Sequence, residues 1–110
     1  DACRRLLALP EPPTAIFLAN DEMAFGAIHE LRRMGRDVPG DVSVVGFDDL
    51  YLSEAFFPPL TTVAQPRAEI GRRAMGMLLD MLSGAPAPQE PVILPTTLKV
   101  RGTTAAPKIS

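Results

Sequence analysis

The stretch VSVVGFDDLYLSEAFFPPLTTVAQPR, residues 42–67, decides the fold. Residues 42–47 form a short apolar run, which has the length of a strand that is buried on both faces of a sheet. Two adjacent carboxylates, Asp48 and Asp49, end this run. A buried strand that stops on two acids leaves three alternatives open for them: a catalytic acid pair, a clamp for a ligand, or an ordinary turn.

A helix separates this strand from an earlier one. Residues 14–19 are another apolar run, and Asn20 then begins a helix that extends to about Met34 and carries apolar residues at three- and four-residue spacing. The order strand, helix, strand predicts a parallel pair with a right-handed crossover. Asn20 and Asp48 would then lie side by side at the carboxyl edge of the sheet, where open α/β folds bind ligands.

The remaining pattern predicts more α/β structure. Two short segments rich in apolar residues follow near the end of the chain, at residues 92–94 and 98–100. They predict either one strand interrupted at Pro95 or two short strands. The tail from Thr103 is expected to fray. The other predicted elements are a short helix at 2–9, a helical turn at 51–57, a strand at 60–64 and a long helix at 67–82. We therefore predict an α/β fold with a parallel sheet.

Composition narrows the class of protein. The chain has 110 residues, which allows one domain, and a formal net charge of −2. Its basic residues cluster in pairs at most, which argues against a surface that binds nucleic-acid backbone. Cys3 is the one cysteine, so no internal disulfide can form. No apolar run approaches the roughly 20 residues of a membrane span. Residues 1–9 read like the end of a helix, so we expect a piece of a longer protein.

Three segments, in this order and spacing, resemble a known family. They are PTAIFLANDEMAFGAIHELRRMGRDVPGDVSVVGFDD, FFPPLTTVAQPRAEIGRRAMGMLLDML and LPTTLKVRGTT. Together they resemble the C-terminal part of lactose/galactose-repressor-type (LacI/GalR) transcription regulators. The resemblance implies a partial lobe of the type I periplasmic-binding-protein fold. It divides the chain into a truncated helix remnant and linker at 1–12, the C-terminal part of an effector-binding domain at 13–104, and a tail at 105–110.

The family architecture also implies what lies outside these residues. Members carry a helix-turn-helix headpiece that binds operator DNA, and a first lobe that completes the effector site. The helix at 67–83 normally crosses to that first lobe. In this chain alone we expect this helix to pack back on its own lobe or to exchange between two chains. Exposing its apolar surface to water would cost a free energy of roughly 25 cal/mol per Å². A cytoplasmic homodimer that responds to a small molecule is the implied protein.

Four residues match positions at or near the family's effector site: Asn20, Asp48, Asp49 and Gln65. A carboxylate accepts hydrogen bonds from adjacent hydroxyls, and an amide both donates and accepts, which suits a sugar or a similar molecule. Structural alternatives stand beside these roles. Asn20 is also a helix N-cap, and Asp48 also suits a turn after a strand. Asp49 could brace the loop instead of touching the effector.

The resemblance implies a dimer interface as well. Phe25 is a large apolar residue off the buried stripe of its helix, and Tyr51, Leu52 and Phe56 follow the second strand. A two-fold interface uses the same patch twice, so these four residues would form its centre. The alternative for Phe56 is local packing over its own helix.

Two other functions fit parts of the sequence. A periplasmic sugar-binding protein shares the lobe architecture. A small α/β enzyme could use Asp48 and Asp49, but adjacent residues that leave a strand usually diverge, and no nucleophile or phosphate loop accompanies them. His29 lies off the apolar stripe without a metal-binding motif, so we expect it at the surface. We predict no enzyme, no catalytic residue, no metal ligand and no cofactor.

Overall fold

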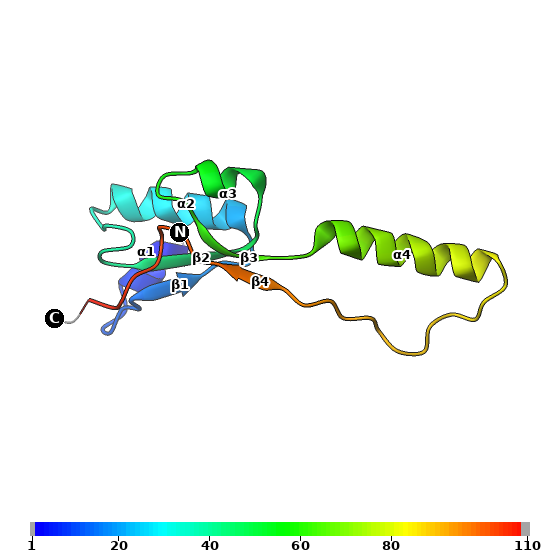
Figure 1. Cartoon of the computed structure of the whole chain (residues 1–110). Helices are drawn as coiled ribbons and strands as arrows, with labels where there is room; N and C mark the ends of the chain where they lie inside the picture. Colours follow the sequence, from blue (N-terminus) through cyan, green and yellow to red (C-terminus); the bar gives the residue numbers. More distant parts are fainter. Residues whose placement is uncertain (1, 109–110) are drawn as a thin grey trace. The chain divides into compact units, whose positions relative to one another are not determined.

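The computed structural model describes residues 2–108 (Figure 1). The elements follow one another as α1 (Ala2–Leu7), β1 (Ala15–Phe17), α2 (Asp21–Arg33), β2 (Ser43–Asp48), α3 (Tyr51–Ala55), β3 (Thr61–Ala64), α4 (Arg67–Leu82) and β4 (Thr97–Lys99). They form two compact units. Unit 1 comprises the residues up to Ala64 and from Leu98 onward, and unit 2 is Gln65–Thr97.

The sheet has the strand order β1-β2-β3-β4. β1 pairs with β2 in parallel, with Ile16 opposite Val44, and β2 pairs with β3 in parallel, with Phe47 opposite Val63. The predicted parallel pair around α2 is therefore confirmed, and the fold is α/β. In Figure 1, α2 and α3 lie above the strands of unit 1.

The helix α2 begins and ends where its sequence indicates. The side chain of Asn20 accepts a hydrogen bond from the amide of Met23 at 2.8 Å, which satisfies one free donor of the first turn. Gly35, with a φ of 72°, follows its C-terminus. The residues of the predicted stripe are buried: Ala24, Ala27, Ile28 and Leu31.

The apolar core of unit 1 gathers residues from α2, β1, β2 and the loops beside them. Ile28, Leu31, Val44 and Leu60 are fully buried. Burial of each such side chain contributes roughly 1.5–3 kcal/mol to folding. The helix α1 adds the buried Cys3 to this cluster.

An ion pair also ties α1 to α2. Arg4 donates a hydrogen bond to the carboxylate of Glu30. This hydrogen bond is the main reason why the pKa of Glu30 lies below the usual range of a glutamate.

The structure corrects the prediction for residues 92–94. They form no strand, and the only regular structure near them is β4, which replaces the strand predicted at 98–100 with a shift of one residue. Pro91 and Pro95 flank the three residues. A proline has no amide hydrogen to donate to a sheet, so two of them so close together leave too little chain for a strand.

The expectation that the tail frays from Thr103 is wrong. Thr103 is fully buried. Its hydroxyl donates to the carbonyl oxygen of Val44 at 2.6 Å and accepts from the amide of Thr61 at 2.9 Å. Further along, the amide of Ala105 donates to the hydroxyl of Ser43 at 3.0 Å. The segment after β4 is therefore fastened to both β2 and β3.

Unit 2 contains α4 and the proline-rich segment that follows it. No side chain of α4 is buried. Its exposed large apolar residues are Ile70, Met75, Leu78, Leu79, Met81 and Leu82. A groove of about 280 Å³ is lined by Gln65, Pro66, Ile70, Arg73, Ala74, Met77, Val92, Leu94 and Thr96. Where the helix 67–83 packs in a complete protein stays a prediction.

Candidate effector site

The turn after β2 has an unusual backbone. Asp48 has a φ of 111° and Asp49 a φ of 54°. Residues with a side chain seldom adopt positive φ, although aspartate tolerates it better than most. Two such residues in succession turn the chain sharply at the carboxyl end of β2. Conformations of this kind often occur at functional sites, where the surrounding structure holds them.

The pairing of the strands places the predicted residues by register. Asp48 is the partner of Ala64 in the parallel pair β2–β3, and Gln65 follows Ala64 directly in the chain. Phe17 is the partner of Val45 in the pair β1–β2. Asn20 follows β1 and caps α2. Asp48 is thus the last residue of β2, while Asn20 and Gln65 follow β1 and β3, the two strands beside it.

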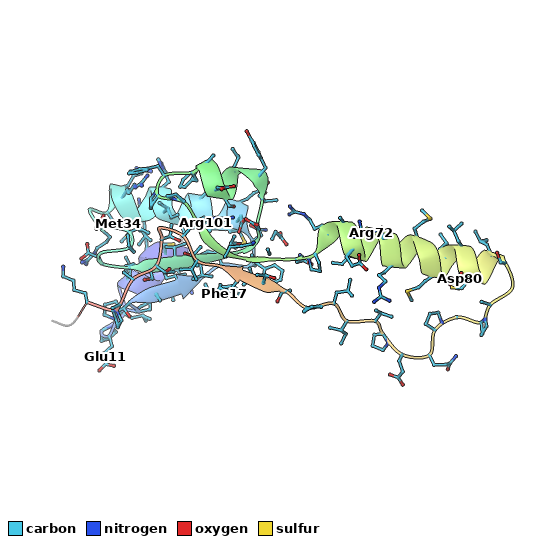
Figure 2. The ribbon with its side chains drawn as sticks, viewed as in Figure 1. Glu11, Phe17, Met34, Arg72, Asp80 and Arg101 are labelled. Carbon is cyan, nitrogen blue, oxygen red and sulfur yellow. The ribbon has the colours of Figure 1, made fainter. Side chains whose placement is uncertain are left out.

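Asp49 forms an ion pair with Arg101 at 2.8 Å, and both side chains are largely buried. Arg101 also donates from Nη1 to the carbonyl oxygen of Leu60 at 3.0 Å, and its amide donates to the hydroxyl of Thr61 at 2.9 Å. Figure 2 labels Arg101 among the side chains of unit 1. These bonds connect the segment after β4 to the turn, which favours the bracing alternative for Asp49.

Asp21 has a role that its sequence context does not reveal, since there it is simply an acid in the first turn of α2. The side chain of Asp21 is fully buried. Its Oδ2 accepts from the amide of Leu50 at 2.8 Å and from the hydroxyl of Ser53 at 2.5 Å. Its Oδ1 accepts from the hydroxyl of Thr62 at 2.5 Å. Hydropathy periodicity carries no signal for such a network.

The four residues predicted for a dimer interface differ in exposure. Phe25 and Phe56 stack on each other, with their ring centroids 4.5 Å apart, and both pack against the core. Tyr51 and Leu52 are 87% and 54% exposed. The aromatic pair is therefore partly used inside the chain, whereas α3 presents open apolar surface.

Other site types find little support in the part of the chain that the structure describes. Within residues 2–108, no group of three His, Cys, Asp or Glu side chains could hold a metal ion. None of the helices found there has both the length and the apolar character to cross a membrane. His29 is exposed, as predicted.

A family model described as a periplasmic binding protein-like domain matches residues 1–104. The chain belongs to this family. The transcriptional repressor CytR of Escherichia coli K12 is 47% identical over 105 residues, which covers 96% of this chain and 31% of CytR. The chain thus spans about a third of the length of the curated relatives it matches.

Solved structures agree with this assignment. A dimeric Lac repressor that lacks 11 C-terminal residues is 41% identical, with a TM-score of 0.81 over 87% of this chain and 35% of the repressor chain. A LacI-family regulator from Enterococcus faecium with bound ribose is 35% identical, with a TM-score of 0.84 over 96% of this chain and 39% of its own. The predicted resemblance to LacI/GalR-type regulators is confirmed, and the alternative of a periplasmic sugar-binding protein is not favoured.

Proposed function

We propose that this periplasmic binding protein-like chain is the effector-binding and dimerisation region of a bacterial LacI-type transcription regulator. The similarity to the CytR repressor across nearly the whole chain carries this proposal. Operator DNA would be bound by a headpiece outside these residues, in a cytoplasmic homodimer. The relatives are regulators, and we propose no enzymatic role.

The effector is a small molecule rich in hydroxyl groups, such as a sugar. Asp48 accepts hydrogen bonds from adjacent hydroxyls, while Asn20 and Gln65 supply amides. The positive φ of Asp48 supports this assignment, because a strained residue at a strand end often serves binding. The ribose complex of the Enterococcus faecium regulator is consistent with a sugar ligand. We propose that Asp49 braces the turn through Arg101 instead of contacting the effector.

Regulation follows from a population shift. The effector binds one arrangement of the two lobes more tightly and so favours it. That choice changes the affinity of the headpieces for the operator by a coupling free energy. The first lobe supplies the other half of the pocket, so the present chain alone should bind its effector weakly.

Asp48→Ala should abolish effector binding in the full-length regulator. Thermal unfolding is followed with ribose, lactose, sugar phosphates and nucleosides. A ligand at about 100 times its dissociation constant stabilises by roughly 2.7 kcal/mol, and the variant should lose that shift. Glu11→Ala, at an exposed carboxylate away from the turn, is the matched control. A shift that survives Asp48→Ala would show that the acid is structural. The absence of any shift in the wild type would contradict effector sensing.

The same regulator should dimerise through Phe25, Tyr51, Leu52 and Phe56. The exposed apolar surface of Tyr51 and Leu52 supports this proposal, as does the dimeric state of the similar Lac repressor. Tyr51 and Leu52 lie on α3, and Phe56 directly follows this helix. Phe56 in turn stacks on Phe25 of α2. The two-fold patch would be centred on α3.

Leu52→Asp should convert the full-length dimer to a monomer in sedimentation experiments at micromolar concentration. A carboxylate buried at the centre of an isologous interface meets its own copy, and like charges repel. Leu9→Asp, at another exposed leucine, should leave the dimer intact. A dimer that persists in Leu52→Asp would overturn this interface. If the 110-residue chain also dimerises regardless of the substitution, exchange of the helix 67–83 is the better account.

A further inference from the structure

The carboxylate of Asp21 is the most heavily used buried polar group outside the proposed effector contacts. It is fully buried and accepts hydrogen bonds from three donors on two separate segments, residues 50–53 and β3. The donors are the amide of Leu50, the hydroxyl of Ser53 on α3, and the hydroxyl of Thr62 on β3. A side chain that only began the helix α2 would need none of these partners.

Two of these bonds act on the turn that carries Asp48. Leu50 directly follows Asp49, so its amide is the first backbone donor after the two residues with positive φ. The hydroxyl of Thr62, which donates to Asp21, also accepts from the amide of Asp49 at 3.4 Å. Thr62 therefore bridges the buried carboxylate to the backbone of the turn.

The strand before the turn is shaped by the same carboxylate. A Cβ atom at Gly46 would collide with Oδ1 of Asp21. The absence of a side chain at this position lets α2 begin close against β2. Asp21 thus contacts the chain on both sides of Asp48 and Asp49.

We propose that Asp21 is a positioning residue for the effector site. Its carboxylate holds the turn in its positive-φ conformation through Leu50 and Thr62, and so directs Asp48. Positive φ in a residue with a side chain persists only where neighbouring groups enforce it. Hydrogen bonds to an ionised oxygen are stronger than those between neutral groups, which suits a carboxylate to this task. The role in binding rests on the proposed function, whereas the control of the turn does not.

The test compares Thr62→Val with Thr62→Ser in the 110-residue chain by NMR, without ligand. Valine has the shape of threonine but lacks the hydroxyl, so both bridging bonds are lost. The readouts are the amide–Hα Overhauser intensities within Asp48 and Asp49, which are high at positive φ, and the amide exchange of Leu50. Thr62→Val should lower the intensities and speed the exchange by about tenfold or more, and Thr62→Ser should restore both.

Two further variants separate positioning from stability. Asp21→Asn keeps the size of the side chain but loses the charge, and it should disturb the turn as Thr62→Val does. If Thr62→Val does not fold, the turn signals of Asp21→Asn test the proposal in its place. Ser53→Ala removes a donor of Asp21 that makes no bond to the turn, so it should leave the turn signals unchanged. The proposal is overturned if Asp21→Asn and Thr62→Val lower only the melting temperature while the turn signals stay as in the wild type.

The link to binding is tested with ribose on the full-length regulator. If ribose binds the wild type, its affinity should fall at least about tenfold in Thr62→Val and remain in Thr62→Ser. An unchanged affinity in Thr62→Val would overturn the role of Asp21 in binding. If neither ribose nor another sugar shifts the wild type, the proposed effector function fails, and the NMR result still decides whether Asp21 controls the turn.

Discussion

Gly46→Ala is expected to destabilise the chain by about 2–5 kcal/mol through overpacking and weakened buried hydrogen bonds, which is a large part of the stability of a domain of this size. The new Cβ would collide with Oδ1 of Asp21, and it would lie 3.0 Å from Cδ2 of Leu60 and 3.3 Å from Cα of Asp21. Overpacking alone costs roughly 1–3 kcal/mol. A shift of Asp21 would also weaken hydrogen bonds to a buried carboxylate, which are expensive to break.

Urea unfolding followed by circular dichroism measures this effect as a lower midpoint with an unchanged slope. Gly26→Ala is the matched control, because a Cβ there meets no atom within 4 Å and the residue lies inside α2. Alanine is preferred over glycine in a helix, so the control should gain roughly 0.5–1 kcal/mol. A cost below about 1 kcal/mol at Gly46 would mean that α2 and β2 can separate easily, contrary to the close packing in the structure.

Thr103→Val should destabilise the chain by about 3 kcal/mol, although valine has nearly the same shape as threonine. The hydroxyl of Thr103 is buried between two backbone groups, the carbonyl of Val44 and the amide of Thr61. Valine would remove a partner from both. A buried polar group left without a hydrogen bond costs about 1–3 kcal/mol, so two such groups account for the expected loss.

The comparison variants for this position are Thr103→Ser and Thr104→Val. Serine keeps the hydroxyl and should recover most of the stability in the same urea experiment. Thr104 is only partly buried, and its hydroxyl is hydrogen-bonded to that of Thr61 at 3.0 Å. Removing this hydroxyl should therefore lower the free energy of unfolding less than Thr103→Val does. Equal and small effects of Thr103→Val and Thr104→Val would show that the segment after β4 is not anchored as the structure indicates.

The substitutions that should lower stability most differ from the one that should lower effector binding. The most costly substitutions are expected at Gly46 and Thr103, neither of which is proposed to contact the effector. They support the sheet from which Asp48 leaves. Asp48→Ala should instead weaken effector binding, because Asp48 is a proposed effector contact at the carboxyl edge of the sheet. Stability and binding can therefore be separated by experiment at neighbouring positions.

Much of the fold could be predicted because it rests on local patterns. The apolar spacing along α2 and the cap at Asn20 are properties of consecutive residues, and they predicted the helix within one residue at its start. Helix α4 was predicted with its observed bounds, since Pro66 precedes it and Gly84 follows it closely. The prediction of a strand at residues 92–94 was wrong. It relied on the apolar residues of this segment, whereas the prolines on either side, Pro91 and Pro95, prevent a strand from forming.

The candidate site could be predicted only in part. The positions of Asp48 and Asn20 follow from the rule that parallel strands end at one edge, and their proposed role follows from the family resemblance. The partner of Asp49 could not be found in the same way. Arg101 lies 52 residues further along the chain, and no periodicity connects it with the turn.

The sequence by itself determined most of the elements, the parallel pair around α2 and the family, because these depend on residue types at short separations. Only the tertiary structure decided which polar residues hold the turn. Asp21 finds its donors 29, 32 and 41 residues away, and Thr103 finds Val44 59 residues away. Hydrogen bonds between buried groups depend on distances of a few tenths of an ångström and on direction. Such geometry exists only after α2, β2, β3 and the segment that follows β4 have packed together.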